Sequence, residues 1–145
     1  MNIERLTATE MIARLKARDF SAKELAQAHL DQIARLDAKV HAWAYLDPEL
    51  TLKHAEGVDK KLAAGTGGVL CGLPVGIKDI FNTIDMPTQM GSPIWKGFTP
   101  GNDARIVHYL RMADAVVLGK TVTAEFAVHA PGPTANPHNL DHMPG

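Results

Sequence analysis

A lysine at the end of an apolar segment is the first candidate for chemistry in this sequence. Lys78 follows residues 74–77 in "GLPVGIKD", which are apolar or small, and Gly76 among them allows a ligand or another backbone to approach closely. If these neighbours desolvate the amine, its pKa falls from about 10.4 toward neutrality, which corresponds to about 4 kcal/mol against the charged form. Lys78 would then serve as a general base. The structural alternative, a solvated lysine at a strand end, is the commoner case.

A second lysine lies in a segment that approaches a phosphate-binding loop. Residues 114–121, "DAVVLGKT", are close to the pattern G-x-x-x-x-G-K-[ST]. The match fails because Asp114 stands where the first glycine is required, and because residues 115–118 are strand formers. We therefore predict a buried strand here and no phosphate site.

The histidines and serines do not complete a site. His138 and His142 have the spacing of helical metal ligands, but "NPHNLDH" contains proline and asparagine and is not expected to be helical. We predict no metal and no cofactor. Ser21 fits a helix cap and Ser92 a turn, and neither lies in a G-x-S-x-G nucleophile pattern. The sequence thus offers a base without a convincing nucleophile.

Composition narrows the class of protein. The 145 residues carry 15 basic and 16 acidic side chains with no run of like charge, which argues against a nucleic-acid or membrane-surface partner. No apolar stretch reaches the ~20 residues of a membrane span, and the N-terminus does not resemble a signal peptide. The single cysteine, Cys71, favours a reducing compartment, so we expect a cytoplasmic protein.

Residues 1–66 are predicted to be mainly helical. Two pairs fit capping boxes at helix starts, Thr7 with Glu10 and Ser21 with Glu24. A short strand is expected within residues 41–46. Asp47 followed by Pro48 then begins a helix that extends to about residue 64.

Residues 67–129 follow a strand–helix–strand pattern, and residues 130–145 form a long irregular loop. Apolar strands are expected in 70–81 and 114–122, with a helix between them that begins at Asp103. This pattern is typical of an α/β protein in which helices cover the faces of a parallel or mixed sheet. Two or three strands are few for a sheet, so we expect the fold to be incomplete in this chain.

Four motifs, in this order, resemble the N-terminal third of the amidase signature family. They are "GLPVGIKD", "DMPTQMGSPIWKG", "DARIVHYLRMADAVVLGKTVTAEFA" and "GPTANPHNLDHMPG", and the match runs from about residue 69 to 145. The resemblance implies that residues 1–145 are the N-terminal fragment of a single amidase domain with a mixed sheet. It also implies an enzyme that hydrolyses a carboxylic amide to an acid and ammonia or an amine, through a serine, a cis-serine and a lysine.

The family lysine falls on Lys78. The resemblance implies that its neutral amine takes a proton from the cis-serine and, through it, from the nucleophilic serine. Both family serines follow the segment that matches residues 144–145. We therefore expect the fragment to carry the base but to lack the serines and the oxyanion donors, and to be inactive alone.

Further residues are placed by the resemblance. Phe126, Ala127, Val128 and His129 match a stretch that lines the acyl pocket in relatives, although a phenylalanine after a helical turn is more often part of a core. Asp114 stands where the family often has glycine, which it can replace in a left-handed turn at a cost of about 1 kcal/mol.

Three functions remain open from the sequence. Relatives of the glutamyl-tRNA amidotransferase A subunit type tend to have Asn-Met-Asp-Glu-Phe-Ala after Gly-Lys-Thr, where this chain has "TVTAEFA". This difference favours the first function, a stand-alone amidase that acts on a small-molecule amide. The second is the amidotransferase A subunit. The third is a non-enzymatic binding module in which Lys78 has only a structural role. Exposed strand edges predict association with the rest of the enzyme or with further copies.

Overall fold

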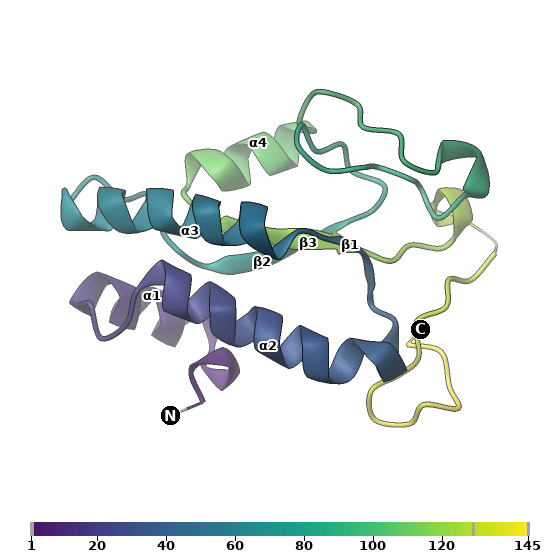
Figure 1. The fold of residues 1–145 in the computed structure, drawn as a ribbon, viewed down its shortest axis with the longest axis horizontal. Coiled ribbons are helices and arrows are strands. Elements are labelled where there is room, and N and C mark those ends of the chain that lie inside the picture. The colour runs from purple at the N-terminus through teal and green to yellow at the C-terminus, as the bar shows by residue number, and fades with distance from the viewer. Residues whose placement is uncertain (1, 129, 145) are drawn as a thin grey trace. The chain divides into compact units, whose positions relative to one another are not determined.

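The computed structural model describes residues 2–128 and 130–144. Helices and strands alternate, which confirms the α/β fold class (Figure 1). The main elements are α1 (Ala8–Ala17), α2 (Ala22–Val40), β1 (Trp43–Leu46), α3 (Pro48–Ala63), β2 (Pro74–Lys78), α4 (Arg105–Met112) and β3 (Val116–Thr121), with short 3-10 helices at Ile3–Arg5, Pro93–Trp95 and Glu125–Ala127. Within the described residues, no helix is long and apolar enough to cross a membrane.

The three strands form one mixed sheet in the order β1–β3–β2. β1 is antiparallel to β3, with Trp43 opposite Thr121. β2 runs parallel to β3, because the Val116 N–H donates to the Leu73 carbonyl at one end and the Asp79 N–H donates to the Thr121 carbonyl at the other, both at 2.9 Å. β3 is therefore the central strand, and β2 has a neighbour on one side within the described sheet.

The chain forms two compact units that interleave along the sequence. The first unit comprises residues 2–32, 47–75 and 108–118, and holds α1, α3 and most of α4. The second comprises residues 33–46, 76–107, 119–128 and 130–144. Lys78 and the whole C-terminal loop belong to this second unit, so the candidate site is built within it.

The predicted caps begin the helices of the first unit. The Thr7 hydroxyl accepts from the Glu10 N–H, and the Glu10 carboxylate accepts from the Thr7 N–H at 2.8 Å. Ser21 and Glu24 form the same reciprocal pair at the start of α2. These two capping boxes are confirmed, because the signals that create them are local to four residues.

The start of α2 is also bound to α3, which lies beside it in Figure 1. The Asp59 carboxylate accepts from the Ala22 N–H at 2.6 Å and from the Lys23 N–H at 3.1 Å. The Arg18 guanidinium donates to the Ala63 carbonyl at 3.1 Å, at the end of α3. A carboxylate at a helix N-terminus and a guanidinium at a C-terminus both match the sign of the helix dipole.

The turn between α4 and β3 contains an aspartate in the left-handed conformation, as predicted. Asp114 has a φ of 64°. Its buried carboxylate accepts from the Gly68 N–H at 2.8 Å and pairs with the Lys61 ammonium at 2.5 Å. A Cβ on Gly68 would lie 2.6 Å from the Ala113 carbonyl oxygen, so this approach requires glycine. Asp114 thus makes contacts that glycine could not supply.

We expect Asp114→Gly to lower the free energy of unfolding by about 1 kcal/mol. Relief of the left-handed backbone returns about 1 kcal/mol, but loss of the charge-assisted bonds costs about 2 kcal/mol. Urea unfolding at pH 7 measures the difference. Asp114→Asn is the matched control, since asparagine tolerates the same conformation and keeps an acceptor for the Gly68 N–H. A glycine variant as stable as the parent would contradict this account.

Candidate active site

Lys78 is exposed at the end of β2, and is not buried as its apolar sequence neighbours suggested. Side chains alternate along a strand, so burial of Ile77, which is 4% exposed, turns Lys78 to the opposite face. Gly76 is approached closely by two side chains, and not by a ligand or another backbone as expected. A Cβ there would lie 2.8 Å from Thr121 Cγ2 and 3.2 Å from the Trp43 ring.

The face on which Lys78 stands forms one wall of a cleft of about 350 Å³. The other walls come from two later segments of the second unit. The lining residues are Val122, Thr123, Ala124, Val128, Pro131, Gly132, Thr134, Met143 and Pro144. Lys78 is the one ionisable side chain among these described lining residues. The amine therefore faces apolar and hydroxyl groups, with no carboxylate in the wall to hold its proton.

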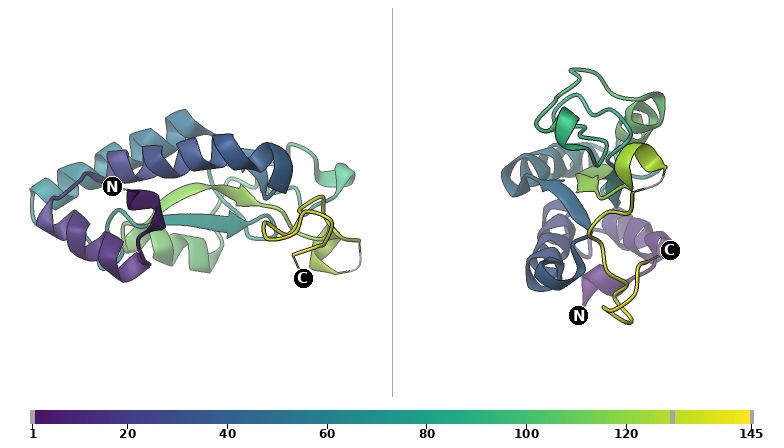
Figure 2. Two further views of the ribbon diagram at one scale, coloured as in Figure 1. Left: turned by 90° about the horizontal axis from the view of Figure 1, so that it is seen from below. Right: turned by 90° about the vertical axis from the view of Figure 1, so that its right-hand side faces the viewer.

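The C-terminal loop that lines this cleft is held by hydrogen bonds to two main-chain carbonyls near the end of α2. The Thr134 hydroxyl donates to the His41 carbonyl at 2.7 Å, and the Ala135 N–H donates to the Val40 carbonyl at 2.8 Å. The loop accordingly lies beside the end of α2 (Figure 2). Gly132 packs so closely that a Cβ would lie 2.4 Å from Val122 Cγ1. This attachment uses the backbone of residue 135 and does not depend on its side chain.

The predicted acyl-pocket stretch forms a strained turn of which one residue reaches the cleft. Val128 lines the cleft, whereas Phe126 is 41% exposed and Ala127 is also exposed, and neither is among the lining residues. His129 lies outside the described residues. Phe126 and Ala127 have φ values of 49° and 60°, a conformation that costs of order 1–3 kcal/mol for each such residue. Other contacts must therefore hold the turn.

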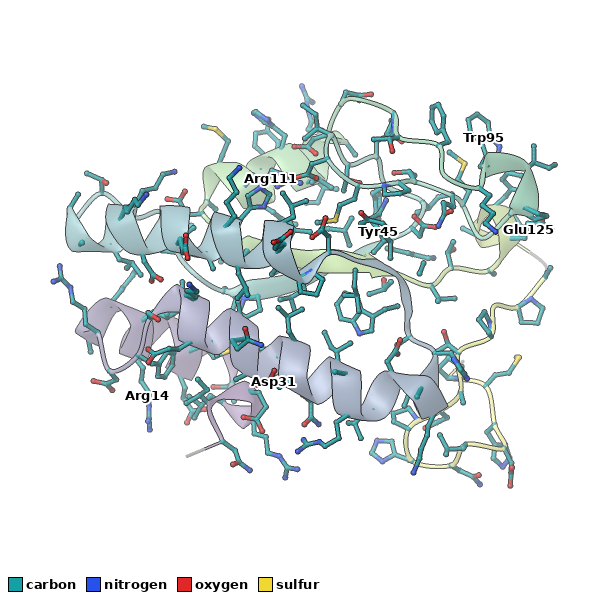
Figure 3. All side chains as sticks on the ribbon, viewed as in Figure 1. Arg14, Asp31, Tyr45, Trp95, Arg111 and Glu125 are labelled. Atoms are coloured by element: carbon teal, nitrogen blue, oxygen red, sulfur yellow. The ribbon has the colours of Figure 1, made fainter. Side chains whose placement is uncertain are left out.

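Those contacts come from the segment before the 3-10 helix at Pro93–Trp95. The Phe126 N–H donates to the Met90 carbonyl at 2.8 Å, and the buried Ser92 hydroxyl donates to the Glu125 carboxylate at 2.6 Å. In Figure 3 the Glu125 side chain lies beside the turn that carries Trp95. Ser92 is thus a structural hydroxyl, in agreement with its predicted place in a turn.

The lysine that the structure does bury is Lys120. It lies in β3, opposite Tyr45 of β1, and its side chain is 0% exposed. Its ammonium donates to Thr88 Oγ1 at 2.7 Å and to the Pro87 carbonyl at 2.9 Å, and lies 3.2 Å from the Asp79 carboxylate. Burial lowers the pKa of Lys120, and the Asp79 carboxylate beside it acts in the opposite direction.

Asp79 directly follows Lys78 and is held through both its side chain and its main chain. Its carboxylate is 1% exposed and accepts from the Gln89 N–H at 3.2 Å. Its own N–H donates to the Thr121 carbonyl, and its carbonyl accepts from the Met90 N–H. Sequence reasoning did not single out this residue. A signal for the pair was present in the sequence: Asp79 and Lys120 carry opposite charges and lie in the two apolar segments that were predicted to be strands of one sheet.

The histidine-rich loop shows no arrangement suited to a metal. Residues 138 and 142 lie in an irregular segment with an isolated bridge between Asn136 and Asn139, so their spacing does not place them on one helical face. Across residues 2–128 and 130–144, no group of three or more His, Cys, Asp or Glu side chains is close enough to hold an ion.

Comparison with known proteins identifies the family. A sequence model described as "Amidase" matches residues 24–145. The chain belongs to the amidase family. The resemblance carried by the four sequence motifs is therefore confirmed, and the α/β arrangement described above is part of the amidase fold.

Individual relatives agree with this assignment. This chain is 46% identical over 148 residues to the A subunit of a glutamyl-tRNA(Gln) amidotransferase from Acidothermus cellulolyticus. The match covers 97% of this chain and 29% of that protein. The chain also matches the X-ray structure of native peptide amidase from Stenotrophomonas maltophilia with a TM-score of 0.89 and 35% identity, covering 97% of this chain and 31% of that one. The chain thus spans about 30% of the length of these relatives.

We expect Lys120→Met to lower the free energy of unfolding by about 3–5 kcal/mol, because it leaves the buried Asp79 carboxylate without its cation. The double variant Asp79→Asn/Lys120→Met removes both charges. We expect its free energy of unfolding to fall by clearly less than that of Lys120→Met. Urea unfolding at pH 7 measures both.

Lys78→Met is the matched control for the same substitution. Because Lys78 is exposed, we expect a change of no more than about 0.5 kcal/mol. Equal losses at the two lysines would contradict the distinction between them.

Proposed function

We propose that the protein to which this chain belongs hydrolyses a carboxylic amide to an acid and ammonia or an amine, with Lys78 as the general base. The observation that carries the proposal is the position of Lys78, at the family lysine and in the wall of a cleft whose other lining groups are uncharged. Family membership supports the reaction class, and it disfavours a non-enzymatic module.

In this reaction the neutral amine of Lys78 accepts the proton of a serine hydroxyl. By resemblance, that hydroxyl is the cis-serine, which in turn takes the proton of the nucleophilic serine, and both lie beyond residue 145. The nucleophile adds to the amide carbon, the C–N bond breaks, and the relayed proton passes to the departing nitrogen. Water then releases the acid. Further chain that covers the cleft would exclude water from Lys78 and favour the neutral amine that a base near neutral pH requires.

An amidotransferase A subunit is the second candidate. The observation in its favour is the 46% identity to a protein named as the A subunit of glutamyl-tRNA(Gln) amidotransferase, compared with 35% to the peptide amidase. In either function we propose that residues 1–145 form the N-terminal part of a single amidase domain, which works in the cytoplasm without a cofactor. Association with the rest of the enzyme, or with other chains, accompanies both.

We expect Lys78→Met in the complete protein to reduce the rate of amide hydrolysis by about 10²–10⁴-fold, because the nucleophile loses its proton acceptor. Ammonia release from small primary amides, peptide amides and glutamine measures it. Lys53→Met is the control, since Lys53 is exposed on α3 in the first unit and does not line the cleft. Retention of the parent rate by the Lys78 variant would exclude the proposed base.

The same assay separates the two candidates. A stand-alone amidase releases ammonia from simple amides without any other macromolecule. The amidotransferase component is expected to show this activity only, or much more strongly, when glutamyl-tRNA and its partner proteins are added.

We further expect the 145-residue polypeptide by itself to release no ammonia from any of these amides, because it holds the base and not the family serines. A polypeptide from the complete reading frame, assayed in parallel, is the positive control. Turnover by residues 1–145 alone would overturn the assignment of the nucleophile to a later segment.

A further inference from the structure

We propose that Lys120 and Asp79 form a positioning pair for Lys78, in which Lys120 compensates the carboxylate next to the base. The compensated carboxylate fixes the direction of Lys78 without holding a proton on its amine. This inference rests on the proposed role of Lys78, and deepens it by assigning a function to a buried ion pair that has no place in the proton relay itself.

The first step of the argument is geometric. Asp79 is anchored on both sides of its main chain, by the carbonyl of Thr121 and the N–H of Met90, and its side chain points inward, where it is 1% exposed. Ile77, on the other side of Lys78, is 4% exposed, whereas Lys78 at the end of β2 is exposed. With a buried residue fixed on each side of it, Lys78 is held at the wall of the cleft.

The second step concerns the ionisation of Lys120. An ammonium group has three N–H donors, and three acceptors surround this one: the Pro87 carbonyl, Thr88 Oγ1 and the Asp79 carboxylate. The Thr88 hydroxyl uses its own proton on the Phe81 carbonyl, at 3.3 Å, so it can only accept from Lys120. The set of partners therefore fits the protonated form of Lys120.

The third step is electrostatic. Of the charged groups near Lys120, Asp79 is in contact and Asp85 acts at longer range. The described residues that line the cleft bring no further charge to Lys78. Without Lys120, Asp79 would be an uncompensated negative charge one residue from the amine. It would stabilise the ammonium form of Lys78, which is the opposite of what a base requires.

The test uses the rate at which Lys78 reacts with an acetylating ester, because neutral amines react and ammonium groups do not. At pH 8 and low salt, mass spectrometry follows acetylation of Lys78 in the parent and in Lys120→Met, with the exposed Lys39 and Lys53 as internal references. We expect labelling of Lys78 to slow about threefold in the variant, because the uncompensated Asp79 carboxylate favours the unreactive ammonium form. The references should not change.

The double variant Asp79→Asn/Lys120→Met decides the cause. Removing the carboxylate as well should restore the parent labelling rate at Lys78, and Lys120→Arg, which keeps the charge, should leave it close to the parent. A rate that stays at the parent value in Lys120→Met would overturn the proposal. So would a rate that stays slow in the double variant, since the effect would then be structural.

Folding of each variant is checked by urea unfolding before labelling. If Lys120→Met does not fold, Asp79→Asn takes its place. This variant has no carboxylate at position 79, whether Lys120 is charged or neutral. The ammonium form of Lys78 is therefore not favoured, and Lys78 must be acetylated at least as fast as in the parent. Slower labelling in a folded Asp79→Asn variant would overturn the proposal equally.

Labelling does not depend on turnover, so this test is separate from that of the proposed function. In the complete protein the corresponding readout is the pH profile of kcat/KM. Activity rises as the proposed base loses its proton, so a more stable ammonium form in Lys120→Met moves the acid limb of the profile to higher pH, and the double variant returns the limb to the parent position. If Lys78→Met retains activity while the labelling pattern holds, the general base is wrong and the ion-pair coupling stands.

Discussion

The pairing of Lys120 with Asp79 is the interaction on which the arrangement of the second unit depends. A buried ammonium and a buried carboxylate are costly unless their remaining hydrogen bonds are satisfied. Here the partners come from three places in the chain: Lys120 from β3, Asp79 from the end of β2, and Pro87 with Thr88 from the loop that follows. Satisfying one ammonium group therefore requires all three segments to be in place. The pair defines a geometry more than it supplies stability.

The position of the candidate base follows from that geometry. Ile77 and Asp79 are buried and Lys78 faces the cleft, and the loop that lines the cleft is attached near the end of α2 by the Thr134 hydroxyl and the Ala135 N–H. The apolar and hydroxyl groups of the wall surround the amine without adding a second charge. The candidate site thus combines a buried ion pair at Asp79 with an uncharged wall beside the proposed base.

Local signals in the sequence predicted the elements well, and non-local ones decided which lysine is buried. Capping boxes and the left-handed Asp114 depend on a few consecutive residues, so they could be recognised without the fold. Lys78 and Lys120 both follow apolar runs and look alike in sequence. They differ because Lys120 is enclosed by Asp79, Pro87 and Thr88, whereas Lys78 is exposed in the wall of the cleft. The groups that enclose Lys120 come from residues 79–88, far from it in the sequence, so a segment of eight residues does not encode them.

The strained turn at residues 125–128 limits what this part of the chain can do in catalysis. Left-handed residues near a reactive group often present free backbone N–H groups to an anion. Here the N–H groups of Phe126, Ala127 and Val128 donate to the carbonyls of Met90, Ala124 and Glu125. All three donors are used within the protein, so the turn can shape the wall of the cleft but cannot stabilise an oxyanion. The donors that an amidase requires for its tetrahedral intermediate are therefore not supplied by these three N–H groups.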